Sequence, residues 1–317
     1  KLDINGRIET TDIFLSDFDS SKSCQVCHQE QYNEWSRSMH AFAMKDPVFI
    51  KGWLKEQEQH PETGERFCVQ CHNPPAFVTG EYLNEYETTD YLPPMINEGI
   101  SCDFCHSVTD LSNTVHTPDN AAAVAEYHLN PGEGIKYGSI ENPVKNDYHE
   151  SQYHPIFKRS DFCLPCHNMT VRGKEVEMTF SEWSSIPQFG MGGLVPCQDC
   201  HMPLKQTDTG EYYHSHEFLG VDIDLTQEVD SQQYQNVETL LQNTLELEFG
   251  GSTDQDIIRI ENSNTLIIPL TIRSLSGHSF PSGTSFSREA WLETIVTKIT
   301  NSTSDTLFSS GLIKSTT

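Results

Sequence analysis

The pentapeptide Cys24-Gln25-Val26-Cys27-His28 is the first of five copies of the pattern Cys-x-x-Cys-His in this chain. The other copies are Cys68-Val69-Gln70-Cys71-His72, Cys102-Asp103-Phe104-Cys105-His106, Cys163-Leu164-Pro165-Cys166-His167 and Cys197-Gln198-Asp199-Cys200-His201. This pattern is typical of c-type haem attachment, in which two thiols bond to the porphyrin and the adjacent histidine binds the iron. The motifs use all ten cysteines, so no thiol remains for a disulfide, a zinc site or a nucleophile. We therefore expect five covalent haems c.

A single Cys-x-x-Cys pair is also typical of half a zinc site or of a redox dithiol. In this chain a histidine follows each of the five pairs directly, which neither of those sites requires. The repeated histidine therefore favours the haem interpretation.

The composition agrees with a protein that is built around cofactors. Only 36% of the 317 residues are hydrophobic, whereas ordinary globular domains reach about 45–50% on a count that includes glycine. Five buried porphyrins would supply the missing apolar core. Without them, we expect the haem-binding part of the chain to be largely unfolded.

The chain is strongly acidic, with 46 acidic residues, 20 basic residues and a formal net charge of −26. This charge argues against nucleic acid as a partner and predicts that a redox partner presents basic patches. No apolar run is long enough to span a membrane. The chain opens at Lys1 on polar sequence without a signal peptide, and covalent haem attachment takes place outside the cytoplasmic membrane. We therefore expect a mature, exported protein that is periplasmic or extracellular.

Changes in sequence texture predict three parts: an N-terminal arm at 1–20, a pentahaem-binding region at 21–218 and a β-rich region at 219–317 that donates a haem ligand. In the first motif region, we expect a helix over 29–44 and a second over 47–58, because Asp46-Pro47 interrupts the pattern. Pro74-Pro75 predicts a loop. Period-two alternation at 245–249, in the 266–272 run and at 291–299 predicts strands, and 306–309 completes a hairpin.

Nine histidines lie outside the motifs, and five second axial positions need ligands. The aromatic helix that carries Tyr32 and Trp35 favours His40, and local context favours His149, His216 and His278. We expect only one of His214 and His216 to ligate the nearer iron. The fifth distal ligand stays open among His116, His128 and His154, and methionine is a less favoured alternative ligand.

Several stretches together resemble one family. They are Cys24–His40 with its Tyr32, Trp35, Ser38 and Met39, then 99–106, Lys136-Tyr137-Gly138, 160–167, 197–203 and the turn at 277–283. The chain resembles the multihaem cytochromes related to the tetrahaem electron carrier that accepts electrons from hydroxylamine oxidoreductase. It departs from that carrier in its fifth motif and its C-terminal β segment. The resemblance implies a mainly helical and irregular chain wrapped around stacked haems, here with a small C-terminal antiparallel β domain. Related extracellular proteins of metal-respiring microbes polymerise into cytochrome filaments.

These observations predict electron transfer through five haems, with no catalytic residues. The expected partners are other redox proteins, an extracellular or periplasmic electron acceptor, or further copies of this chain arranged head to tail. In a filament, one subunit would donate a histidine or a strand edge to the next. The alternative is an enzyme that converts a small nitrogen or sulfur compound at a five-coordinate haem.

Overall fold

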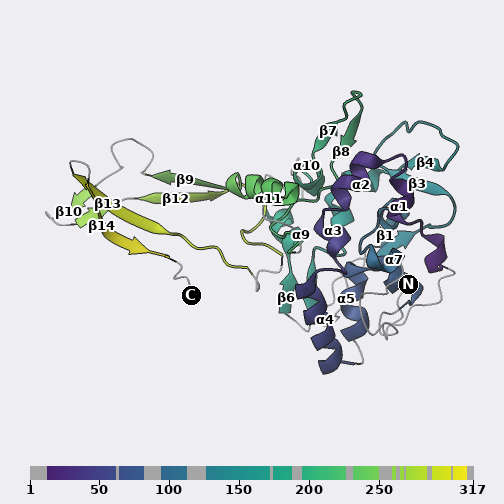
Figure 1. Cartoon of the computed structure of the whole chain (residues 1–317), viewed down its shortest axis with the longest axis horizontal. Helices are drawn as coiled ribbons and strands as arrows, with labels where there is room; N and C mark the ends of the chain where they lie inside the picture. The colour runs from purple at the N-terminus through teal and green to yellow at the C-terminus, as the bar shows by residue number, and fades with distance from the viewer. Residues whose placement is uncertain are drawn as a thin grey trace.

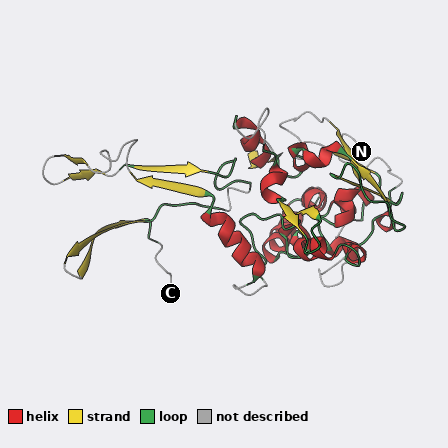
Figure 2. Ribbon diagram, turned by 90° about the horizontal axis from the view of Figure 1, so that it is seen from above, coloured by secondary structure: helices red, strands yellow, loops and turns green. Residues whose placement is uncertain are grey.

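The computed structural model describes residues 13–61, 64–81, 94–112, 126–171, 174–187, 195–225, 231–249, 259–261, 265–267, 269–283, 288–300 and 303–312. Figure 1 shows two regions: a helical body at one end of the long axis, and β ribbons that extend from it at the other. Helix α11 lies between them (Figures 1 and 2). No helix among the described residues is long and apolar enough to cross a membrane.

Short helices dominate the body, and the Cys-x-x-Cys-His motifs lie on or beside them. The α-helices are α1 (Ser21–Cys24), α2 (Gln29–Trp35), α3 (Met39–Phe42), α4 (Pro47–Gln59), α5 (Gly64–His72), α6 (Pro74–Thr79), α7 (Pro94–Asn97), α8 (Cys102–His106), α9 (Thr179–Ser185), α10 (Cys197–His201) and α11 (Gln232–Gln242). The 3-10 turns are η1 (Leu15–Asp17), η4 (Pro155–Lys158) and η5 (Ser160–Cys163). Helices α8 and α10 each consist of one motif, so their first cysteine and their histidine lie one turn apart.

Local capping explains where the helices differ from the predicted ones. The predicted helix over 29–44 is two helices, α2 and α3, because Ser38 starts a new helix and its Oγ accepts a hydrogen bond from Ala41 N. The second predicted helix is present as α4, with Asp46 as its N-cap. The loop predicted at Pro74-Pro75 is wrong: these prolines begin α6, where a missing N–H costs nothing, and Asn73 caps the helix.

Each sheet of the described residues has two strands. In the body, the pairs are β1 (Val108–Ser112) with β2 (Glu126–Leu129), β3 (Ile135–Gly138) with β4 (Glu150–Tyr153), β5 (Met169–Val171) with β6 (Lys174–Glu177), and β7 (Leu204–Gln206) with β8 (Tyr212–His214). In the ribbons, they are β9 (Leu245–Phe249) with β12 (Leu270–Ser274), β10 (Arg259–Glu261) with β11 (Thr265–Ile267), and β13 (Thr294–Thr300) with β14 (Thr303–Ser310). Only the β3–β4 pair of these is parallel.

The structure places strands where the C-terminal alternation predicts them, but it also contains a helix that we did not predict. Helix α11 begins at the N-cap Ser231 and buries Gln233 and Val237. We did not predict this helix because its residues are mostly polar and the surrounding sequence favours strands. The predicted N-terminal arm also differs: residues 1–12 lie outside the described residues, whereas Phe18 is buried against Met95 and Phe104 and therefore belongs to the body.

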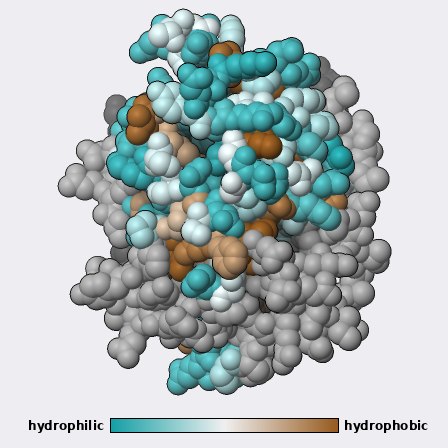
Figure 3. Space-filling model, turned by 90° about the vertical axis from the view of Figure 1, so that its right-hand side faces the viewer, coloured by the Kyte–Doolittle hydropathy of each residue, from teal (hydrophilic) through white to brown (hydrophobic). Residues whose placement is uncertain are grey.

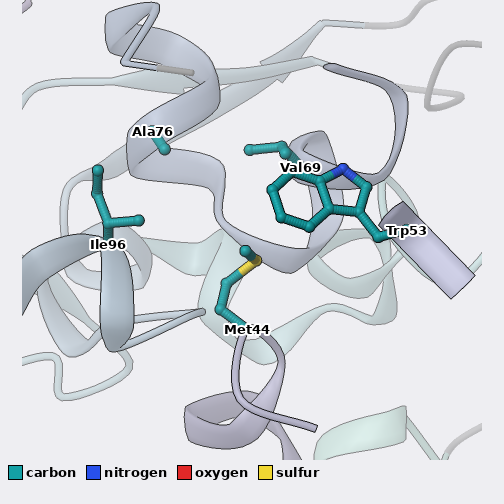
Figure 4. Close-up of a cluster of buried hydrophobic side chains, with 5 residues drawn as sticks. All are labelled: Met44, Trp53, Val69, Ala76 and Ile96. Carbon is teal, nitrogen blue, oxygen red and sulfur yellow. The ribbon is translucent and has the colours of Figure 1, made fainter. Parts of the chain in front are cut away.

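The packed core of the body is small. Met44, Trp53, Val69, Ala76 and Ile96 form one buried cluster, drawn in Figure 4. Figure 3 views the end of the body away from the ribbons, where the described residues are mostly hydrophilic with small hydrophobic patches between them. The buried residues of this cluster and of the one around Phe18 include none of the motif histidines.

Candidate haem-binding site

Four of the five motif histidines each face a histidine from a distant part of the chain. The pairs are His28 with His149, His40 with His167, His106 with His216, and His201 with His278. In all four pairs the ring centres lie 6.3 Å apart. The four partner histidines are those that the sequence favours as distal ligands.

This spacing fits one metal ion between the two rings. A metal–imidazole bond is about 2.0 Å long, so two imidazoles on opposite sides of one metal have ring centres roughly 6 Å apart. Stacked aromatic rings lie closer, as Phe49 shows at 3.7 Å from His72. The donor set, two neutral imidazoles beside two thiols, fits the iron and the porphyrin of a c-type haem.

Hydrogen bonds fix the rings in the tautomer that binds iron through Nε2. The Nδ1 of His106 donates to Tyr137 O at 2.6 Å, and the Nδ1 of His216 donates to His214 O at 2.7 Å. His72, His201 and His278 make equivalent bonds to the carbonyls of Ala43, Leu219 and Ser279. Such outer contacts orient metal-binding histidines and leave the other nitrogen free.

Burial favours the neutral form of His40 and His216, which metal binding requires. Burial lowers the pKa of His40 to about 3, and the neighbouring His167, His201 and His72 lower it further. Burial also lowers the pKa of His216 to about 4, with His106 as the next cause.

The fifth motif histidine, His72, differs from the others. No described histidine faces it, and the Phe49 ring of α4 stacks on it instead. Of the open candidates, His128 is exposed on β2, and the Nδ1 of His154 accepts a hydrogen bond from Ile156 N as the cap of η4. That bond gives His154 the reversed tautomer, with its proton on Nε2. His116 lies outside the described residues.

The motifs are packed against one another in pairs. The free thiols of different motifs lie close together in three pairs, which are Cys24 with Cys102, Cys71 with Cys166, and Cys163 with Cys197. Motif one therefore lies beside motif three, motif two beside motif four, and motif four beside motif five. The thiols of Cys105 and Cys166 also lie near each other, so motif three is beside motif four as well.

Two buried serines make the same contact in two of these pairs, and sequence reasoning missed both. Ser21 Oγ accepts a hydrogen bond from Cys102 N at 3.1 Å, and Ser160 Oγ accepts one from Cys197 N at 3.0 Å. Each serine stands three residues before the first cysteine of its own motif, Cys24 or Cys163, and contacts the other motif of the pair. That shared offset is the signal that could have revealed them.

The segment that carries His40 is held by close backbone packing. Gly99 has a φ of +66°, and a Cβ there would lie 2.6 Å from His40 O. Ile100 N donates to the same carbonyl at 3.1 Å, and the Trp35 indole donates to Ile100 O at 2.8 Å. Glycine is therefore required where this loop passes the ligand.

Comparisons with known proteins indicate the same class of protein. Residues 23–107, which include the first three motifs, match the model of the family described as cytochrome c554 and c-prime. The fold is similar to the crystal structure of a penta-haem cytochrome c552 from Thermochromatium tepidum, with a TM-score of 0.59 and 21% sequence identity over 84% of this chain and 68% of that one. The comparison with curated proteins finds no match. At this identity the likeness shows a shared fold. It supports the resemblance to multihaem c-type cytochromes.

Proposed function

We propose that this protein transfers electrons through five covalently attached c-type haems, and that four of these have histidine on both sides of the iron. The observation that carries the proposal is the common 6.3 Å spacing of the four histidine pairs, each of which joins a motif to a distant segment. Two histidine ligands fill both axial positions of an iron, so no substrate binds there. Such haems store and pass single electrons when bound, and their potentials depend on ligands, burial and nearby charge.

The contacts between motifs support a continuous path for electrons. Motif one adjoins motif three, three adjoins four, and four adjoins five, while motif two adjoins motif four. The path therefore branches at motif four. We infer that electrons enter and leave at the outer motifs and that the protein is exported, as covalent haem attachment requires.

The intact mass of the denatured protein and a redox titration test this function. We expect a mass greater than that of the polypeptide by five haems, and low-spin spectra for at least four of them. Four or fewer haems, or high-spin iron at most sites, would contradict the proposal.

The surroundings of His72 favour a second candidate function at one haem. No described histidine faces His72. An iron held by His72 without a second ligand would be five-coordinate and open to a small nitrogen or sulfur compound. Carbon monoxide added to the reduced protein distinguishes the two functions. Binding to one haem, together with turnover of nitrite or hydroxylamine, would favour an enzyme, whereas no binding leaves electron transfer alone.

We also propose that the partner in electron transfer is a further copy of this chain. One supporting feature is an apolar face of the β9–β12 ribbon, on which Leu247, Phe249 and Ile272 are exposed. The other is His214 on the β7–β8 hairpin. His214 donates its Nδ1 to Met202 O, as the ligand histidines do to their carbonyls, yet it faces no motif histidine among the described residues. Analytical ultracentrifugation and electron microscopy of native material test the assembly, and His214→Ala should weaken it. A monodisperse monomer would contradict it.

A further inference from the structure

We propose that two buried carboxylates, Glu34 and Asp103, position the two axial ligands of the haem held by His106 and His216, and that their negative charge lowers the reduction potential of that haem. This inference rests on the proposed function, because it concerns one haem of the electron path. It is carried by two clusters of charged side chains, one on each side of the same iron position.

The cluster on the distal side is centred on Glu34, which α2 places in the interior. One carboxylate oxygen accepts a hydrogen bond from His216 N at 2.8 Å. The other accepts from Lys205 Nζ at 2.8 Å and from Tyr213 OH at 3.0 Å. Glu34 thus holds the strand end on which His216 stands, through its backbone on one side and Tyr213 on the other.

Lys205 connects this carboxylate to a second one. Its Nζ also bonds to Glu217, which accepts a further hydrogen bond from Asn236 of α11. The ammonium group of Lys205 and the hydrogen bonds from His216 N and Tyr213 OH stabilise the charged form of the Glu34 carboxylate.

The cluster on the proximal side is centred on Asp103, which lies inside the third motif. Its side chain is 1% exposed, and it bonds to Lys136 Nζ at 2.5 Å and to Asp19 N at 2.7 Å. Lys136 is next to Tyr137, whose carbonyl accepts the Nδ1–H of His106. Asp103 therefore holds the strand that orients the proximal ligand.

The two clusters have the same charge. Each places one lysine between two carboxylates, Glu34 and Glu217 in one and Asp103 and Asp19 in the other. Two negative charges and one positive charge give each cluster a net charge of −1, but Asp19 is 63% exposed, so solvent screens its charge. The buried carboxylates of Glu34 and Asp103 are screened far less, and negative charge near the iron favours the ferric over the ferrous state. The haem between the clusters should therefore have a lower potential than it would have in neutral surroundings.

Glu182, a carboxylate beside another proposed ligand, allows a comparison within the same protein. Glu182 accepts a hydrogen bond from Ser279 N, next to the distal ligand His278, but it is only half-buried and no described lysine bonds to it. Its effect on the haem of His201 and His278 should be smaller, because solvent screens it.

The test compares matched carboxylate-to-amide variants of the holoprotein by redox titration, followed by electron paramagnetic resonance. Glu34→Gln and Asp103→Asn keep the shape of the side chain and remove its charge. Each should raise the potential of the same haem, with all five haems present and low-spin. The His216→Met variant identifies that haem by the signal that it alters. Glu141→Gln, at the exposed ion pair with Lys158, should shift no haem, and Glu182→Gln should shift a different haem by less.

The outcomes separate this inference from the proposed function. An unchanged or lowered potential in Glu34→Gln, with haem content intact, would overturn the inference while five redox-active haems in the native protein still support electron transfer. If Asp103→Asn fails to mature, Glu34→Gln decides alone. Loss of thermal stability in these variants without any shift of potential would show a merely structural role and would likewise overturn it.

Discussion

The body buries many polar side chains, whereas the C-terminal ribbons expose large apolar ones. In the body, polar side chains such as Ser21, Asn73, Asp103 and Ser160 are buried. In the ribbons, large apolar side chains such as Phe249 and Ile272 are exposed. On the proposed function, haems would supply the apolar interior that the polar body lacks, and a partner would cover the exposed apolar side chains of the ribbons. Each region would then depend on a component outside its own polypeptide, but the component differs.

The largest effect should follow from removing one haem from the body. In the double variant Cys102→Ser and Cys105→Ser, the third motif loses both attachment points. We expect a protein with at most four haems and a largely unfolded body, because this motif packs against motifs one and four. Intact mass and limited proteolysis measure both results. A protease-resistant body with four haems would show that the cofactors do not form the core.

The second test concerns the junction between the regions. Of the four proposed distal histidines, only His278 lies in the C-terminal region, in the segment between strands β12 and β13. His278→Met should retain five haems and raise the potential of one of them, because a methionine ligand favours ferrous iron. The measurement is a spectroelectrochemical titration. If every potential and spectrum is unchanged, His278 is not a ligand.

Much of this junction could be predicted from the sequence, and the reason is chemical. The motifs specify their own histidines, and Gly277-His278-Ser279-Phe280-Pro281 marks a rigid turn that would hold a ligand. The sequence could not say which motif His278 faces, because that pairing depends on packing between distant segments. It also could not reveal the role of Glu34 or Lys205, since neither stands near His106 or His216 in the chain.

The secondary structure could be predicted where hydrophobic alternation is strong. The prediction failed where a capping residue sets the start of a helix. Alternation at 245–249 marks β9, whereas Ser38 divides a helix and Asn73 starts one at two prolines. Helix α11 was missed because its apolar residues are few. Local side-chain hydrogen bonds, which periodicity does not report, set these boundaries.

A smaller effect should come from Gly99→Ala within the body. The change places a Cβ against His40 O and forces a φ of +66° on alanine, so we expect a loss of stability of about 1–3 kcal/mol. Gly134→Ala is the matched control, because its φ is +67° and nothing lies within 4 Å of the added Cβ. Thermal unfolding followed at the Soret band measures both. Equal losses in the two variants would show that close packing against the His40 segment contributes nothing.

The smallest change in stability should come from the ribbons. On the apolar face of the β9–β12 ribbon, Leu247 is paired with Ile272, and on the polar face Glu246 is paired with Arg273. Threonine at Leu247 and Ile272 keeps the preference for strand while removing apolar surface. Because both side chains are about half exposed, we expect an unfolding free energy within about 0.5 kcal/mol of the native value.

Association is where this double variant should differ from the native protein. An isolated two-stranded ribbon is marginally stable in water, so the exposed face indicates a partner surface, which we propose is a second copy. Leu247→Thr with Ile272→Thr should weaken self-association in sedimentation velocity, whereas Glu246→Gln on the polar face should leave it unchanged. Equal sedimentation of all three proteins would assign this face to a different partner. A marked loss of monomer stability would instead mean that the ribbon packs within its own chain.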